Sequence, residues 1–278
     1  MEKILLALDP QNLSMNAIDF ACYISRLTRS KLTGVFLENL EYEERAAMRN
    51  LHGEPTIDGR IGIDSLGKLQ KAQQTDLNIP FFKEACCSRG VSPLIHRDRG
   101  IPVSETIEES RYADCIIVDP ETSFSKTNEG NPGKFVNDLL LDSECPVIIS
   151  PYSFEEIEEI IFTFNGSKSS LFAIKQFTYL FPELKQKKVI VVSVVKEDQS
   201  TIEDQFKMKE WLNDHYQEVQ YVLLNGDPSD QLFGFLIEKK NSIVVMGAFG
   251  RGLLSRFIKP SHARLIMKTV NLPIFIAH

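Results

Sequence analysis

Short runs of branched aliphatic residues recur along the chain, and each is followed by a polar turn and then by helical spacing. In the second half these runs are Glu159–Phe164, Lys188–Val195, Glu218–Leu224, Ser242–Gly247 and Leu272–His278. They contain many Val and Ile residues and alternate little with polar residues, which is typical of parallel strands covered on both faces. The pattern predicts helices between them, at Ser170–Leu180, Ile202–His215, Asp230–Lys239 and Ser261–Lys268.

The first half of the chain repeats the pattern of the second. The segment that starts at Lys3 aligns without a gap with the segment that starts at Glu159, and Ile4, Ser14 and Tyr23 then lie opposite Ile160, Ser170 and Tyr179. Two later pairs of segments also match, Ala113–Asp119 with Asn241–Gly247 and Glu144–Ser150 with Asn271–Ala277. A repeat of this length predicts two units of one design.

The two copies differ by one insertion. The offset between aligned residues is 156 at Lys3 and Glu159, and 128 at Ala113 and Asn241, so the first copy has about 28 extra residues. We place them within Glu41–Leu77, a polar stretch with four glycines, and expect a mobile surface excursion, with a dedicated binding element as the alternative. The predicted domains are residues 1–151 and 152–278, joined through Ser150–Glu159.

Strands that alternate with helices indicate right-handed crossovers. The expected fold class is therefore α/β, with two tandem doubly wound domains, each with a mainly parallel sheet and helices on both faces. In such sheets ligands bind beyond the carboxyl ends of the strands, where the strand order reverses. The turns that follow strands are the candidate sites.

Composition narrows the class of partner. The chain has 278 residues, of which 43% are hydrophobic and 25% charged, and a formal net charge of −7. The negative charge argues against a global affinity for nucleic acid or anionic membranes. The sequence has no apolar run of about 18 residues and its start lacks the features of a signal peptide, so we expect a cytoplasmic protein.

Catalytic and metal-binding patterns are missing from the sequence. The five cysteines, Cys22, Cys86, Cys87, Cys115 and Cys145, lack the spacing of a zinc site, so we expect no metal role. Cys22 and Cys115 lie in apolar stretches and are expected to be small core residues. No Ser-His-Asp order, H-E-x-x-H motif or nucleophile elbow occurs. We therefore expect no catalytic residues and no enzyme activity, with slow nucleotide hydrolysis as a residual alternative.

A glycine-rich loop follows the predicted strand at Ser242–Gly247. It contains Gly247, Gly250 and Gly252, and Lys259-Pro260-Ser261 then opens a helix. Glycines after a buried strand let backbone N–H groups approach a phosphate, and a helix start attracts anions. The spacing is neither a Walker loop nor a dinucleotide fingerprint, so the pattern alone fits a tight structural turn equally well.

The run from Ile243 to His278 resembles the final segment of the universal stress protein family. That family has a Gly, two residues, a Gly, nine residues, and then Gly followed by Ser or Thr; here Gly247, Gly250 and Ser261 match. The openings Lys3–Pro10 and Glu159–Ser167 and the run Asn225–Gly247 are also similar to the family. The similarity covers nearly the whole chain as two tandem copies and excludes the insertion.

The resemblance implies a five-stranded α/β sheet in each half, similar to adenine nucleotide alpha hydrolases, and many family members bind ATP or AMP. It implies that Val194 packs on adenine and that nucleotide contacts come from the loop after the first strand of the second half. The implied residues are Asn165, Gly166, Ser167, Val194, Met246, Gly247, Gly250, Arg251, Ser261 and His262. The family usually has Asp at the place of Asn165 and Gly at the place of Pro260.

The first copy divides the signature differently. Asp9 matches the acid of the family and is a weaker candidate contact, with capping of the next helix as an equal alternative. The glycine loop is replaced by Asp119-Pro120-Glu121-Thr122, and carboxylates at this place repel phosphate. Phe36 is bulkier than the residue usual at the adenine wall. We expect the phosphate cradle to be lost in this copy.

Two hypotheses follow. The first is a cytoplasmic, non-catalytic stress-response module that binds ATP or AMP in its C-terminal domain and requires no cofactor. Its halves would form an intramolecular pseudo-dimer through Pro146–Ser150 and Pro273–Ala277, with a homodimer as a further assembly and no nucleic-acid or membrane partner. The alternative is a stress-linked scaffold or small-ligand module whose nucleotide sites are degenerate.

Overall fold

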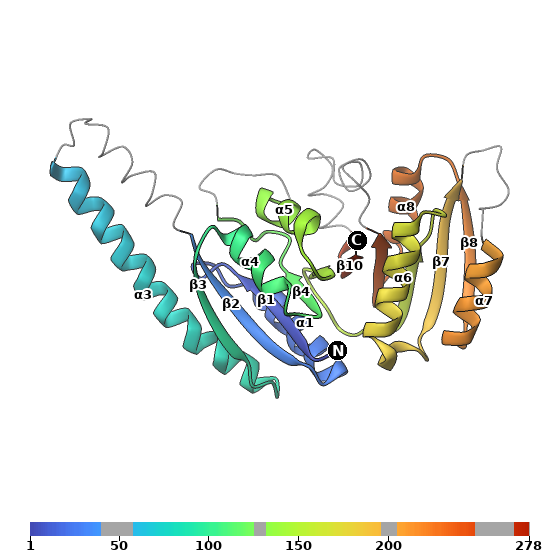
Figure 1. The fold of residues 1–278 in the computed structure, drawn as a ribbon, viewed down its shortest axis with the longest axis horizontal. Helices are drawn as coiled ribbons and strands as arrows, with labels where there is room; N and C mark the ends of the chain where they lie inside the picture. Colours follow the sequence, from blue (N-terminus) through green and yellow to red (C-terminus); the bar gives the residue numbers. More distant parts are fainter. Residues whose placement is uncertain (40–57, 125–131, 196–204, 248–269, 278) are drawn as a thin grey trace.

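Ten strands form one continuous sheet (Figure 1). The computed structural model describes residues 1–39, 58–124, 132–195, 205–247 and 270–277. Within these residues the strand order is β3-β2-β1-β4-β5-β10-β9-β6-β7-β8. The first half supplies β1 (Lys3–Leu8), β2 (Lys31–Asn39), β3 (Leu94–Gly100), β4 (Cys115–Val118) and β5 (Val147–Ile149). The second half supplies β6 (Glu159–Thr163), β7 (Lys188–Val195), β8 (Val219–Asn225), β9 (Ser242–Gly247) and β10 (Ile274–Ala277).

The two halves have the same doubly wound topology. In each half the first strand is central, the second and third strands lie on one side of it, and the fourth and fifth lie on the other. All strand pairs within a half are parallel. The expected fold class is confirmed, and the five strands predicted for the second half are all present.

The halves join through their last strands. Strand β10 pairs antiparallel with β5, and Ile274, Phe275 and Ile276 lie opposite Ile149, Ile148 and Val147. This confirms the predicted pairing of Pro146–Ser150 with Pro273–Ala277. Because the junction is antiparallel, the carboxyl ends of the two sets of parallel strands point to opposite edges of the sheet.

Helices cover both faces of the sheet. One face carries α1 (Met15–Thr28), the end of α3 (Asp58–Ser88), α6 (Lys168–Leu180) and α7 (Gln205–His215). The other carries α4 (Pro102–Ser110), α5 (Lys134–Asp142) and α8 (Pro228–Leu236), and a short 3₁₀ turn, Pro182–Leu184, follows α6. In β1, Ile4 and Leu6 pack on the first face and Leu5 and Ala7 on the second. Burial on both faces explains the weak alternation of the strand sequences.

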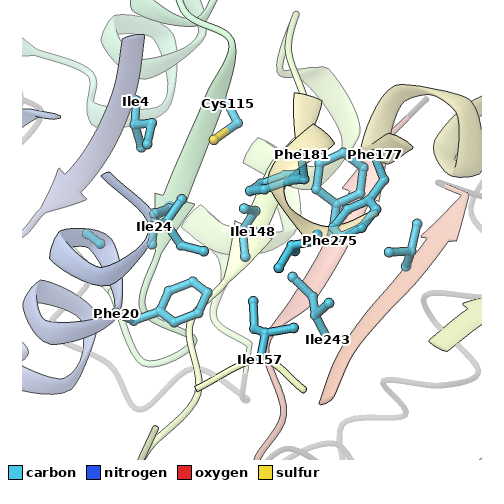
Figure 2. Packing of buried hydrophobic residues seen from close by; sticks show 14 of the residues in the cluster. Ile4, Phe20, Ile24, Cys115, Ile148, Ile157, Phe177, Phe181, Ile243 and Phe275 are labelled. Atoms are coloured by element: carbon cyan, nitrogen blue, oxygen red, sulfur yellow. The ribbon is translucent and has the colours of Figure 1, made fainter. Parts of the chain in front are cut away.

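The core crosses the junction between the halves. Figure 2 shows Ile4, Phe20 and Ile24 of the first half and Phe177 and Phe275 of the second in one buried cluster. The ring of Phe275, on β10, lies 5.3 Å from that of Phe177 and is perpendicular to it. This continuous apolar packing stabilises the junction in addition to the backbone hydrogen bonds between β5 and β10.

Helix α3 changes the interpretation of the insertion. Residues 40–57 lie outside the described part, but α3 runs for 31 residues from Asp58 and includes Pro80. Its first turns extend beyond the edge of the sheet (Figure 1). Residues 58–77 are therefore helical, and α3 ends in the core at Phe82, Ala85 and Cys86, while the expected mobility of the insertion stays a prediction.

The predicted helices of the second half agree with the structure in place, and α6 and α7 end at Leu180 and His215 as predicted. Helices α6, α7 and α8 begin at Lys168, Gln205 and Pro228, whereas the predicted helix Ser261–Lys268 lies outside the described residues. Strand β5 ends at Ile149 and β6 begins at Glu159, on either side of the proposed linker. The domain boundary at 151/152 stays a prediction.

Candidate functional site

Three neighbouring strands end together in the second half. Strand β6 lies between β7 and β9, so the turn Asn165-Gly166-Ser167 after β6 lies between the end of β7 at Val195 and the end of β9 at Gly247. The chain passes from β6 to β7 on one side and later crosses from β8 to β9 on the other side of β6, so the strand order reverses here. The sequence-predicted residues Asn165, Val194 and Gly247 are therefore at one edge of the sheet.

The turn after β6 is built to start a helix. The Asn165 side-chain oxygen accepts a hydrogen bond of 3.1 Å from the Ser167 N–H, and Gly166 has a φ of +78°, which favours glycine. The Ser167 hydroxyl then accepts from the Ser170 N–H at 3.2 Å as the N-cap of α6. The positive end of the α6 dipole is thus at the carboxyl end of β6.

Gly247 has a packing role that the sequence did not show. A Cβ atom on Gly247 would lie 2.5 Å from the carbonyl carbon of Ser169 and 2.6 Å from the backbone nitrogen of Ser170. Real Cβ atoms do not approach backbone this closely, so the end of β9 lies directly against the first turn of α6. The glycine that begins the candidate loop is required by this contact, whatever ligand the loop meets.

The side chains of Val194 and Met246 lie on the face of the sheet that is opposite to α6. Both side chains are partly buried and pack against the cluster beneath α8. Met246 also contacts the cluster of the first half that contains Ile276 of β10. The remaining predicted residues, Gly250, Arg251, Ser261 and His262, lie outside the described part of the chain.

In the first half the corresponding edge carries two partly buried carboxylates. Asp9 follows β1 and Asp119 follows β4, and these strands are neighbours. Asp119 accepts a hydrogen bond of 2.5 Å from the Ser14 hydroxyl and one of 2.7 Å from the Glu121 N–H. Burial raises the pKa of both carboxyl groups, although these hydrogen bonds partly oppose it. The predicted loss of a phosphate cradle fits this arrangement.

Asp9 does not cap a helix. Its carboxylate accepts from the Gln11 N–H at 2.9 Å and shapes the turn after β1, whereas the N-cap of α1 is Ser14. Of the two alternatives from the sequence, capping by Asp9 is therefore wrong. The Asp9 carboxylate is used within its own turn.

Helix α3 covers this edge of the first half. The Gln11 side-chain amide donates to the Lys71 carbonyl at 3.1 Å and to the Thr75 hydroxyl at 3.2 Å. The Asn78 amide donates to the Pro10 carbonyl at 2.8 Å. These bonds fasten the turn after β1 to a helix 60 to 68 residues further along the chain.

Phe82 of α3 packs on Phe36, the residue that the resemblance places at the adenine wall of the first half. Its ring lies 5.6 Å from the ring of Phe36 and perpendicular to it, and both residues are fully buried. A Cβ atom on Gly34 would lie 2.5 Å from the Phe82 ring. Sequence analysis missed this contact, although a glycine inside a strand is a signal that another group approaches closely.

The cysteines and the acidic residues form no metal site among the described residues. All five thiols are free, and only Cys87 is exposed. Cys22 of α1 and Cys86 of α3 are hydrogen-bonded to each other, which lowers the pKa of Cys22 and raises that of Cys86. In the described part of the chain, no helix is long and apolar enough to span a membrane.

Comparison with known proteins identifies the fold. Family models and curated protein sequences gave no match. Among solved structures, a universal stress protein from Archaeoglobus fulgidus DSM 4304 is similar over 99% of this chain and 97% of its own, with a TM-score of 0.67 and 16% identity. A protein of unknown function from Pseudomonas aeruginosa PAO1 covers 99% and 92%, with a TM-score of 0.51 and 13% identity.

A third structure, a candidate universal stress protein from Pseudomonas aeruginosa UCBPP-PA14, covers 99% of this chain and 92% of its own, with a TM-score of 0.50 and 12% identity. These similarities extend across both halves and their junction, which agrees with the resemblance read from the sequence. The chain has the fold of the tandem universal stress proteins.

Proposed function

We propose that this chain is a tandem universal stress protein whose second half binds an adenine nucleotide, ATP or AMP, and that it acts as a non-catalytic stress-response module. Three lines support the proposal: the shared fold, the resemblance of the glycine-rich segment to the family signature, and the geometry at the end of β6. The nucleotide is a bound ligand in this proposal and not a required cofactor.

One difference between the halves carries the argument. Asp119 and Gly247 occupy matching positions in the repeat, at the end of the fourth strand of each half. In the first half the Asp119 carboxylate is bonded to the N-cap residue of α1. In the second half the matching residue is a glycine that lies against the first turn of α6 and brings no charge. A helix N-terminus favours an anion. At the matching position the first half supplies one, the Asp119 carboxylate, whereas the second half has the uncharged Gly247.

The contacts of the first half support the alternative hypothesis, a scaffold or small-ligand module, for that half. Asp119, the α3 contacts to Gln11 and Pro10, and the Phe36–Phe82 pair occupy the edge where a nucleotide would bind. In the proposed protein this half therefore supports the structure or binds a partner other than a nucleotide. If the second half fails to bind nucleotide as well, the scaffold hypothesis replaces the proposal.

The test is calorimetric titration of the purified full chain with ATP and with AMP, beside Ser167→Asp and Ser167→Asn variants. Both substitutions are good N-caps, so α6 keeps its start, but only Ser167→Asp adds a charge that repels phosphate. We expect wild type and Ser167→Asn to release similar heat, and Ser167→Asp to bind at least about tenfold more weakly.

Two outcomes reject the proposal. Absence of heat with millimolar ATP and AMP, together with no nucleotide released from freshly purified protein in mass spectrometry, would favour the scaffold. Equal affinity of the two variants would mean that the nucleotide does not bind at the N-terminus of α6. Ser167→Asp is preferred to a change at Gly247, because any side chain there collides with the backbone of α6.

A further inference from the structure

The ten-stranded sheet has two edges that are equivalent by the repeat. Strand β3 is the third strand of the first half and β8 the third strand of the second, and each lies at one end of the strand order. Within the described residues each has one neighbour, β2 or β7. Exposed edges leave backbone groups ready to pair with another chain, so proteins usually protect them.

The β3 edge is protected by charge. It has four consecutive titratable residues, His96, Arg97, Asp98 and Arg99. Arg97 and Arg99 are paired with Glu38 of β2, and Arg97 is also paired with Asp76 of α3 at 2.8 Å. Another strand could add here only by burying these charges, which is costly.

Strand β8 itself carries no such charges. Its seven residues, Val219-Gln220-Tyr221-Val222-Leu223-Leu224-Asn225, include no charged side chain and no proline. Leu223 is 39% exposed. A long, uncharged and apolar edge is a surface for strand addition.

The hydrogen bonds to β7 define which backbone groups of β8 face outward. The Val189 N–H donates to the Glu218 carbonyl, and the Gly226 N–H donates to the Val195 carbonyl, both at 3.0 Å. In a parallel pair the bonding residues alternate, so the even-numbered residues of β8 bond to β7. The N–H and C=O groups of Val219, Tyr221, Leu223 and Asn225 therefore point away from the sheet.

We propose that this edge binds the β8 edge of a second copy of the chain, antiparallel, about a two-fold axis at Val222. This register places Tyr221 opposite Leu223 and Val219 opposite Asn225 of the second copy, so every outward-facing residue finds a partner. A shift by two residues leaves one end of each strand unpaired. The cross-strand pairs are apolar or neutral, and no like charges meet.

The chain already uses this mode of association internally. Strands β5 and β10 are also uncharged, pair antiparallel and join two five-stranded units into one sheet. A β8–β8 contact would continue the same sheet into a second molecule. A two-fold contact of identical edges closes on itself and yields a dimer and not a filament.

The test is the mass of the full chain in solution, by analytical ultracentrifugation, for wild type, Leu223→Lys and Leu94→Lys. Leu94 is the matched control: it is an exposed leucine, 54% accessible, on the equivalent edge strand β3. We expect wild type and Leu94→Lys to have twice the mass of the chain, and Leu223→Lys to have the mass of one chain. Circular dichroism checks that all three are folded.

A cysteine at the two-fold axis tests the register. In a Cys87→Ser background, Val222→Cys places two thiols in a non-hydrogen-bonded cross-strand pair, where Cβ atoms are about 4.5–5.5 Å apart. Mild oxidation should cross-link this variant to a covalent dimer. Gln220→Cys should not cross-link. Residue 220 lies opposite residue 224 of the second copy, so the two copies of residue 220 are four positions, or roughly 13 Å, apart along the strands.

A monomeric wild type overturns the proposal and leaves a strand of another protein as the occupant of the edge. A dimer that persists in Leu223→Lys, or that cross-links equally through both cysteine variants, also overturns it, because the contact must then lie elsewhere or in another register.

Discussion

The Ser14 hydroxyl donates a hydrogen bond of 2.5 Å to the carboxylate of Asp119, which connects the turn after β4 to the N-cap of α1. These residues are 105 positions apart in the chain. In the second half, Ser167 caps the matching helix but Gly247 stands where Asp119 would be. Both halves therefore have a serine N-cap at this helix. The residue opposite the helix start is an aspartate in the first half and a glycine in the second.

The partly buried Asp119 carboxyl group should make the free energy of unfolding depend on pH. Burial raises its pKa in the folded protein above the ordinary value of 3.8, so the folded state holds this proton more tightly than the unfolded state. Its favourable contribution is complete below about pH 3.8 and is lost as the pH rises through the folded-state pKa. In Asp119→Asn this loss should be absent.

The measurement is the free energy of unfolding in urea, for wild type and Asp119→Asn, from acid to neutral pH. The stability of the variant relative to wild type should increase with pH from about 4 and then level off. A relative stability that decreases with pH would mean that the Ser14 and Glu121 hydrogen bonds outweigh burial.

The strands and their topology could be predicted because burial on both faces leaves a local signal. Ile4 and Leu5 are adjacent in sequence but belong to cores on opposite faces, and the Val- and Ile-rich runs follow from this. The Ser14–Asp119 bond left no such signal. Sequence placed a carboxylate where phosphate would bind, but its hydroxyl partner comes from a distant turn and depends on the fold.

Helix α3 is an element that the sequence pattern did not predict. Its polar first half and its glycines gave no apolar periodicity, so the pattern indicated a loop where the structure has a helix from Asp58. Among the described side chains of α3, those that belong to the core are in its last turns, Phe82, Ala85 and Cys86. A helix that buries one end of its length has too few apolar positions for the periodicity to be recognised.

The contact between Gly34 and Phe82 should be sensitive to a single methyl group. Gly34→Ala places a Cβ atom about 2.5 Å from the Phe82 ring, which must shift to make room. We expect a loss of stability of about 1–3 kcal/mol in urea unfolding. Phe82→Leu should lower stability in wild type but cost less in the Gly34→Ala background, since the smaller side chain relieves the collision.

Additive effects of Gly34→Ala and Phe82→Leu would contradict this packing. Residues in contact should show a coupling energy of about 0.5 kcal/mol or more in the double-mutant cycle. Additivity would indicate that α3 does not dock on β2 through Phe82.

The thiols should differ strongly in their reaction with a disulfide reagent. Cys87 is exposed, whereas Cys22, Cys86, Cys115 and Cys145 are buried. Burial also raises the pKa of Cys145 to about 12 and that of Cys115 well above its ordinary value, which suppresses the reactive thiolate. The native protein should expose one reactive thiol and the protein in denaturant five; Cys87→Ser should react only after unfolding. Rapid reaction of a second thiol in the native protein would show that α3 opens from α1.

Arg29 offers a place where one substitution should stabilise the fold. It follows α1 with a φ of 54°, in the left-handed region, and its N–H closes the helix by bonding to the Ser25 and Arg26 carbonyls. A side chain in this conformation is strained, whereas glycine adopts it readily. Arg29→Gly should therefore raise the free energy of unfolding by about 0.5–1 kcal/mol. Arg29→Ala is the matched control, because it removes the same charge but keeps the Cβ atom. If the two variants are equally stable, charge and not backbone conformation determines the effect, and the left-handed end of α1 costs the fold nothing.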